Sequence, residues 1–207
     1  MSEEIYSSFN KDSGVSEVRS GTEPESPPDR QQESSRDDSK MNSFLREWLP
    51  YIIFLIAVIL FRIFILINAT IPTESMVATI EKNNHIMGLK CSYWFSEPER
   101  GDIVVFHAPD TPDTLYIKRV IGTPGDTVVI SDGKTYVNGE ALEEDYLPEP
   151  MEGSFGPYVV PEGAWFMMGD NRNHSLDARY WKNTWVTKNL IVGKAYFRYW
   201  PPFKWLY

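Results

Sequence analysis

Residues 48–67 read WLPYIIFLIAVILFRIFILI, and Arg62 is the one charged residue in this stretch. Twenty apolar residues in an α-helix match the roughly 30 Å thickness of a bilayer's hydrocarbon core. A cleaved signal peptide is one competing interpretation, but its apolar region spans only about 7–15 residues near the N-terminus. A buried helix of a soluble protein is the other. The length and composition predict a transmembrane helix over residues 48–67.

The residues that flank this stretch differ in charge. Lys40 and Arg46 precede it closely, whereas the next cation after Arg62 is Lys82. Basic residues accumulate on the cytoplasmic side of membrane spans. We therefore expect a single-pass protein of the cell membrane, in contact with lipid, whose N-terminus is cytoplasmic and whose residues 69–207 are extracytoplasmic.

The N-terminal segment is acidic and poor in apolar residues. Residues 1–40 contain 10 Ser, and 5 Lys and Arg against 10 Asp and Glu. Such a segment buries too little apolar surface to offset the entropy lost on ordering its backbone. The sequence predicts a disordered acidic cytoplasmic tail over residues 1–47. The net charge of the whole chain, −9, excludes a basic nucleic-acid-binding surface as its dominant feature.

Residues 69–207 predict a β-rich domain. Turn signals separate its β-branched and aromatic runs, and Asp132-Gly133 between TVVIS and KTYVNG is typical of a β-hairpin. The runs cover residues 85–89, 103–106, 115–121, 127–130, 135–137, 165–168 and 191–199. A long apolar period of 3.6 residues is missing from this part of the sequence. The predicted fold class is mainly β, behind a single N-terminal transmembrane helix.

Several kinds of chemistry are excluded by the sequence. It contains no HExxH, no Walker-type GxxxxGK and no GxGxxG after a strand, and its one cysteine, Cys91, excludes an internal disulfide and a Cys-rich metal site. Nothing local places His85, His107 or His174 beside an exposed serine, so each is more typical of a surface or loop histidine. We expect no metal and no cofactor.

A serine and a lysine suggest another kind of nucleophilic site. Ser75 lies in PTESMVATI just after the apolar stretch, and Lys118 lies in YIKRVIGTPGD, within a strand pattern. A lysine among Tyr116, Ile117 and Val120 can lose solvation, which lowers its pKa. The neutral amine can then act as general base to a serine hydroxyl. The pattern alone also fits a solvated lysine on a strand face.

Residues 48–207 resemble the type I signal peptidases (leader peptidases) of bacteria. Four blocks stand in the expected order: PTESMVATI at 72–80, RGDIVVF at 100–106, YIKRVIGTPGD at 116–126 and GDNRNHSLDARYW at 169–181. The resemblance implies a membrane-bound serine endopeptidase with a coiled β-sheet ectodomain. Such an enzyme removes N-terminal signal peptides from exported preproteins, cuts after small residues, and has the secretion translocon as a candidate partner.

The resemblance also assigns catalytic roles. It makes Ser75 the nucleophile, Lys118 the general base, and Ser175 the hydroxyl that orients the lysine amine. The main-chain N–H of Ser75 and the hydroxyl of Thr73 would form the oxyanion hole.

Further residues would support the site or bind substrate. The resemblance implies a structural role for the turn that contains Asp170, Asn171 and Arg172, and for an ion pair between Asp177 and Arg179. It also implies that the substrate binds as an extended strand between two edges of the protein. The residues of these edges are Ile71, Pro72, Leu115, Tyr116 and Ile117, with Thr73 at the end of the first.

The sequence departs from the family pattern at a few positions. Ala78 replaces a usual proline, Asn173-His174 replaces Asp-Asn, Ala178 replaces serine, and Lys182 stands where glycine is common.

Three other functions remain open. They are a soluble self-cleaving Ser-Lys repressor protease, a signal peptidase with a histidine base, and a membrane-anchored β module that binds peptides without cleaving them. The apolar stretch opposes the first and Lys118 opposes the second. The third does not require Ser75, Lys118 and Ser175 together.

Overall fold

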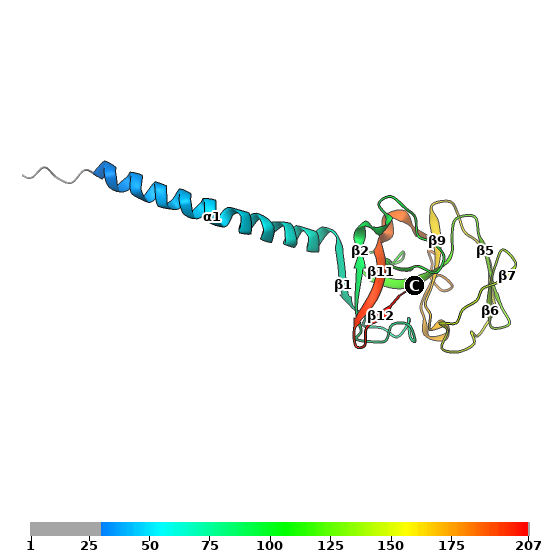
Figure 1. Ribbon diagram of the computed structural model, residues 1–207. Helices are drawn as coiled ribbons and strands as arrows, with labels where there is room; N and C mark the ends of the chain where they lie inside the picture. The colour runs from blue at the N-terminus through cyan, green and yellow to red at the C-terminus, as the bar shows by residue number, and fades with distance from the viewer. Residues whose placement is uncertain (1–29, 207) are drawn as a thin grey trace, which may run out of the picture. The chain divides into compact units, whose positions relative to one another are not determined.

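The computed structural model describes residues 30–206, with side chains from residue 43 onward (Figure 1). Its one long helix, α1, spans Arg30–Phe64. The predicted helix over residues 48–67 was therefore wrong at its C-terminal end, which lies at Phe64, and the helix continues before residue 48. Residues 30–47, expected to be disordered, are helical, and the rest of the predicted tail, residues 1–29, lies outside the described residues. A helix nucleated in the apolar stretch can extend backward through good helix formers such as the Gln, Glu, Arg and Lys residues of this segment.

The apolar part of α1 has the properties of a membrane span. Ser43–Phe64 is long and apolar enough to cross a bilayer. Its large apolar side chains, including Phe54, Leu55 and Ile63, are exposed. A helix that is apolar on all sides is stable where its surroundings are apolar as well.

A single residue, Ile65, links the helix to the first strand. α1 ends at Phe64 and β1 spans Leu66–Thr70, so residues 66 and 67 belong to a strand rather than to the predicted helix. Lys90 fixes this junction: its N–H donates to the carbonyl of Ile65 (2.8 Å) and its Nζ donates to the carbonyl of Ile63 (2.7 Å). A cation beside the last carbonyls of a helix satisfies groups that have no partner within the helix.

The regular elements described after β1 are strands and short 3-10 helices. The strands are β2 His85–Leu89, β3 Ile103–His107, β4 Leu115–Gly122, β5 Thr127–Ser131, β6 Lys134–Val137, β7 Glu140–Ala141, β8 Phe155–Val159, β9 Ala164–Met168, β10 Val186–Thr187, β11 Ile191–Trp200 and β12 Lys204–Trp205. The 3-10 helices are η1 Lys90–Tyr93, η2 Arg172–His174 and η3 Lys188–Leu190. Each predicted run corresponds to a strand to within one residue at either end, which confirms the mainly β prediction.

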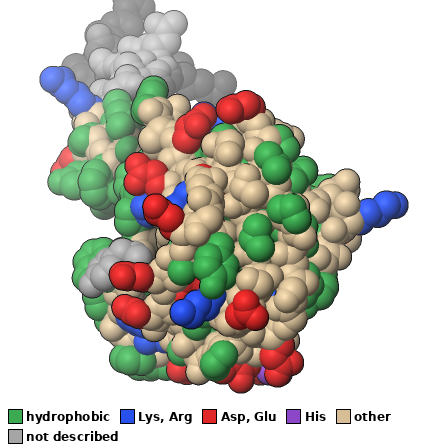
Figure 2. All heavy atoms as spheres, turned by 90° about the vertical axis from the view of Figure 1, so that its right-hand side faces the viewer, with side chains coloured by type: hydrophobic (Ala, Val, Ile, Leu, Met, Phe, Trp, Pro, Cys, Tyr) green, Lys and Arg blue, Asp and Glu red, His purple; other side chains and the backbone are tan. Residues whose placement is uncertain are grey.

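The strands form two antiparallel sheets. The first has the order β1-β2-β11-β3-β4-β9-β10, with β12 paired to β11, and the second has the order β7-β6-β5-β8. The predicted hairpin joins β5 to β6, where Asp132 and Gly133 both have positive φ (53° and 73°), as a type I′ turn requires. On the side of the molecule near β5–β7, Asp and Glu side chains are scattered over the surface (Figure 2).

Two apolar clusters form the core. One joins the two sheets and includes Val128 and Ile130 of β5 with Phe166 of β9. The other packs residues of the segment after β1, such as Ile71 and Met76, against residues of β2, β3 and β4. The second cluster therefore anchors the segment that carries Ser75.

Candidate active site

Ser75 lies in a compact turn that follows β1. Its neighbour Met76 is fully buried, as is Ile80, and these two side chains fix the turn to the core. The N–H groups of Thr79 and Ile80 donate to the carbonyl of Met76 (2.9 and 2.7 Å). Ala78, which departs from the family pattern, lies within this hydrogen-bonded turn. The side chain of Ser75 is nearly buried but lines the main pocket of the domain.

A second turn, Gly169–Asn171, holds the Ser75 segment from the other side. The N–H of Asn171 donates to the carbonyl of Ser75 (3.0 Å), and its side-chain Nδ2 donates to the carbonyl of Glu74 (3.0 Å). Gly169 lies close to both Ser75 and Ser175. A Cβ on Gly169 would be 2.4 Å from the Ser75 carbonyl oxygen and 2.3 Å from Ser175 Oγ. Glycine is required here because any side chain would displace one of these groups.

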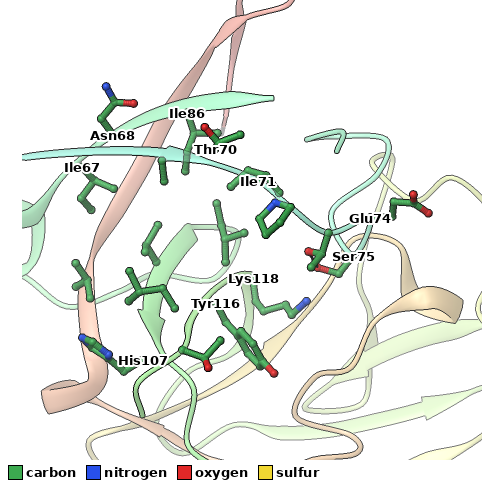
Figure 3. A pocket seen from close by; sticks show the side chains of 18 of the residues that line it. Ile67, Asn68, Thr70, Ile71, Glu74, Ser75, Ile86, His107, Tyr116 and Lys118 are labelled. Carbon is green, nitrogen blue, oxygen red and sulfur yellow. Dashed lines mark hydrogen bonds between the residues drawn. The ribbon is translucent and has the colours of Figure 1, made fainter. Parts of the chain in front are cut away.

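Lys118 comes from the buried part of β4. It pairs with Val104 of β3 and is 4% exposed, so the alternative of a solvated strand lysine is wrong. In the pocket its side chain points toward Ser75 (Figure 3). Burial lowers the pKa of Lys118 to about 8, against the opposing effect of the Asp177 and Asp170 carboxylates. Arg179 also lowers this pKa.

Ser175 lies beyond the end of β9, the strand that pairs with β4. Arg119 of β4, the residue after Lys118, pairs with Met168, the last residue of β9, and a Cβ on the following residue, Gly169, would be 2.3 Å from Ser175 Oγ. The Ser175 side chain is buried, and its hydroxyl has no hydrogen-bond partner among the described residues. A buried hydroxyl usually has a partner. The hydroxyl of Ser175 therefore retains an unused capacity to donate and accept hydrogen bonds.

The predicted oxyanion residue is close to the nucleophile. Thr73 Oγ1 is 3.4 Å from Ser75 Oγ, with either hydroxyl able to donate. Both residues line the same pocket. The Thr73 hydroxyl is therefore within reach of an oxygen that develops negative charge beside Ser75.

Buried ion pairs lie near Lys118. The predicted pair is present: Arg179 Nε donates to Asp177 Oδ1 (2.8 Å) and its Nη2 donates to Asp177 Oδ2 (2.9 Å). Asp170 accepts two hydrogen bonds from Arg119 (2.8 and 2.7 Å). Arg172, predicted to support the site, is 1% exposed. These fixed charges determine the electrostatic environment of Lys118.

Sequence reasoning missed two of the residues that complete these pairs. Arg119, which binds Asp170, lies in the block YIKRVIGTPGD, but neither the pattern nor the resemblance gives it a role. Glu144, whose Oε1 accepts from Arg172 Nη2 (2.5 Å), lies in a loop with no motif. For Arg119 a signal existed, because an arginine in an apolar strand next to a buried lysine needs a carboxylate partner.

The pocket holds all the predicted substrate-binding residues. It has a volume of about 890 Å³, and the residues that line it include Ile71, Pro72, Leu115, Tyr116 and Ile117. A pocket of this size, apolar with a few polar groups at one end, is typical of a site that binds a peptide or small molecule.

Within the part of the chain that the structure describes, no histidine is hydrogen-bonded to Ser75, although His174 lines the same pocket. His107 lies at the end of the pocket far from Ser75 (Figure 3), and its Nδ1 is bonded to the carbonyl of Pro112 (2.6 Å). His174 Nδ1 is 3.3 Å from Asn171 Oδ1, and His85 Nδ1 is 3.1 Å from Thr70 Oγ1. Among the described residues, no cluster of three or more His, Cys, Asp or Glu side chains could hold a metal ion.

Comparison with known proteins agrees with these features. Residues 45–200 match the family described as "Signal peptidase, peptidase S26". The chain is 40% identical to a signal peptidase I of Leptolyngbya laminosa, over 68% of this chain and 71% of that protein. It is 38% identical to the signal peptidase I of Bacillus caldolyticus, over 75% of this chain and 91% of that protein.

A chloroplast protein and a solved structure are also similar. Thylakoidal processing peptidase 1 of Arabidopsis thaliana is 40% identical over 70% of this chain and 45% of its own length. A crystal structure of a signal peptidase I from Enterococcus faecalis V583 aligns with 48% of this chain and 97% of its own, at 34% identity and a TM-score of 0.43. The chain belongs to the peptidase S26 family of signal peptidases, serine peptidases that remove signal peptides, and is anchored to its membrane by the N-terminal helix.

Proposed function

We propose that this signal peptidase cleaves preproteins with Ser75 as nucleophile and Lys118 as general base. The observation that carries this assignment is the buried Lys118, with its pKa lowered to about 8, in the same pocket as Ser75 and directed toward it (Figure 3). A base works best when its pKa is near the operating pH. An ordinary lysine, with a pKa of 10.5, would hold its proton.

In the first half of the reaction, the neutral Nζ of Lys118 takes the proton of Ser75 Oγ as this oxygen attacks the scissile carbonyl carbon. The carbonyl oxygen gains negative charge and accepts hydrogen bonds from the Thr73 hydroxyl and the N–H of Ser75. The Lys118 ammonium then donates its proton to the leaving amine, and the C–N bond breaks. This leaves the end of the signal peptide esterified to Ser75.

In the second half, Lys118 takes a proton from a water molecule as the water oxygen attacks the ester carbon. The Lys118 ammonium then returns this proton to Ser75 Oγ as the ester C–O bond breaks, which releases the signal peptide and restores both groups. Ser175 supplies an oxygen that keeps the amine directed at the nucleophile. Its hydroxyl lacks a partner within the described chain, which leaves it available for this hydrogen bond. Asp177 and Asp170 stabilise the ammonium that forms in each half.

The pocket walls favour an extended substrate with small side chains near the cut. The backbone of the substrate would lie between residues 71–73 and residues 115–117, which line opposite sides. Because side chains alternate along a strand, the first and third residues before the cut would face the same apolar wall. Large side chains at these positions would collide with it.

The orientation in the membrane is part of this proposal. The cations before the span, Lys40 and Arg46, favour a cytoplasmic N-terminus and an extracytoplasmic pocket, beside the translocon from which preproteins emerge. The exposed aromatic side chains of Trp94, Phe95 and Trp200 would rest at the lipid headgroups. Protease added to intact cells should remove the β domain and leave the N-terminus protected. The opposite pattern would refute this orientation.

The catalytic assignment is tested with the purified full chain in detergent and a preprotein substrate. Ser75→Ala and Lys118→Ala should each abolish release of the signal peptide while circular dichroism shows a folded domain. Ser43→Ala, in the helix, serves as the control. If Lys118→Ala retains activity within tenfold of the unmodified enzyme, the assignment of the base is wrong.

A further inference from the structure

Glu144 is a buried carboxylate in a surface loop. It follows β7, and its neighbours Glu143 and Asp145 are exposed, like the other acidic side chains on this part of the surface (Figure 2). The side chain of Glu144 is only 5% exposed. Burial of a carboxylate is costly unless it is paired and hydrogen-bonded. This contrast with its neighbours indicates a specific role.

Glu144 binds the guanidinium of Arg172 with both carboxylate oxygens. Arg172 Nη2 donates to Oε1 (2.5 Å) and Nη1 donates to Oε2 (3.3 Å). The Tyr146 hydroxyl donates to the same Oε1 (2.8 Å), and the Tyr146 ring lies 4.0 Å from the Arg119 guanidinium carbon. One loop from the second sheet therefore contacts two arginines behind the catalytic groups.

Arg172 transmits this contact to the Gly169–Asn171 turn. Its Nε donates to the carbonyl of Gly169 (3.1 Å), while the N–H of Gly169 donates to Asp177 Oδ2 (3.1 Å). Gly169 is therefore held at both its N–H and its carbonyl. Because Gly169 contacts the Ser75 carbonyl and Ser175 Oγ, a displacement of this turn displaces both serines.

We propose that Glu144 is a positioning residue for peptide cleavage, which fixes Arg172 and through it the Gly169 turn against Ser75 and Ser175. This role rests on the proposed functions of Ser75, Lys118 and Ser175. It differs from simple neutralisation of a buried arginine, which would require the charge of Glu144 but not its length. Charge and length can be changed separately at this position.

The experiment compares Glu144→Asp with Glu144→Gln in the full chain in detergent. Asp keeps the charge but is one methylene shorter, so Arg172 must move to reach it. Gln keeps the length and an oxygen acceptor but loses the charge. We expect kcat of Glu144→Asp to fall about tenfold, because small misplacements of reacting groups cost this much or more. Glu144→Gln should stay within threefold, and KM should change little in either variant.

Glu143→Asp and Glu143→Gln, at the exposed neighbouring position, are the matched controls and should retain the kcat of the unmodified enzyme. All rates are measured at a temperature at which thermal melts show that each variant is fully folded. A Glu144→Gln variant that loses as much kcat as Glu144→Asp would overturn the proposal, as would two variants with unchanged kcat. If Glu144→Asp does not fold, Tyr146→Phe replaces it and kcat should again fall, because this variant removes the hydroxyl that donates to Glu144 (2.8 Å) and accepts from Arg172 Nη2 (3.5 Å).

Failure of the positioning role is distinguishable from failure of the catalytic assignment. Ser75→Ala is measured in the same assay, and cleavage by this variant would refute the nucleophile whatever the Glu144 variants do. Full inactivity of Ser75→Ala together with unchanged kcat in both Glu144 variants would refute only the positioning role.

Discussion

Replacement of Lys118 by Met should inactivate the enzyme and stabilise its fold at neutral pH. Met has a similar length and suits the apolar surroundings of Lys118, which is 4% exposed. It removes the base, so cleavage is lost. It also removes an ammonium that burial destabilises. The residue that the reaction needs is thus one that the folded domain would be more stable without.

The magnitude follows from the pKa of Lys118. Folding lowers this pKa from 10.5 to about 8. At about 1.36 kcal/mol per pKa unit, the difference corresponds to about 3 kcal/mol. Below pH 8 the lysine is charged in both the folded and the unfolded chain, and the full cost is present. Between pH 8 and 10.5 the unfolded chain binds more protons, so the stability of the unmodified protein rises with pH.

Denaturant unfolding at pH 7, 9 and 10.5, followed by circular dichroism in detergent, measures this effect. The difference in unfolding free energy between Lys118→Met and the unmodified chain should be largest at pH 7 and shrink by about 3 kcal/mol by pH 10.5. Lys134→Met, at an exposed position of β6, should show no such change. A difference for Lys118→Met that is the same at all three pH values would refute the buried-amine explanation.

The same pKa sets the pH dependence of cleavage. With a pKa of about 8, roughly a tenth of the enzyme has a neutral Lys118 at pH 7 and roughly nine tenths at pH 9. The rate should therefore rise nearly tenfold over this range. His174→Gln, in the pocket wall, should leave this rise unchanged. An acid limb near pH 6.5 that moves in His174→Gln would indicate a histidine base.

Further predictions concern the oxyanion hole, the glycine turn and the anchor. Thr73→Val should lower kcat about a hundredfold and Thr73→Ser should retain most of it, as single-turnover rates would show. Gly169→Ala should lower kcat about a hundredfold, because its Cβ must push the Ser75 carbonyl or Ser175 by about 1 Å. Gly122→Ala, whose Cβ would lie nearest to side-chain atoms of Val128, Val160 and Phe166, should lower the melting temperature and spare kcat. Deletion of residues 1–40 should leave cleavage unchanged, whereas deletion of residues 1–64 should slow cleavage of membrane-inserted preproteins but not of short peptides.

The sequence predicted strands well where local composition decides them. β-branched and aromatic runs such as residues 103–106 and 127–130 became β3 and β5 almost to the residue. β1 was missed because Leu66 and Ile67 continue the apolar stretch of the helix, and composition does not mark where helix gives way to strand. β8 was missed because Gly156 and Pro157 within it are typical of turns.

In the candidate site, local pattern predicted a lysine that could lose solvation but not what surrounds it. The apolar neighbours of Lys118 in β4 are visible in the sequence. The ion pairs near Lys118 are not visible there, because each joins residues that lie far apart in the sequence. Arg119 and Asp170 are 51 positions apart, and Glu144 and Arg172 are 28 apart. Within the acidic run 143–145, only tertiary structure shows which carboxylate is buried.

The junction between α1 and β1 determines which peptide bonds the enzyme can reach. A flexible linker of ten residues has an r.m.s. end-to-end distance of roughly 15–20 Å, so it would not fix the position of the domain relative to the helix. Here Ile65 alone separates helix from strand, and Lys90 binds the carbonyls of Ile63 and Ile65. Ser75, eleven positions after Phe64, is therefore at most roughly 40 Å of extended chain from the end of the helix. If Ser75 is the nucleophile, as we propose, cleavage takes place within this distance of the membrane, and the spacing between a preprotein's own apolar segment and its cleavage sequence decides whether the bond comes within reach.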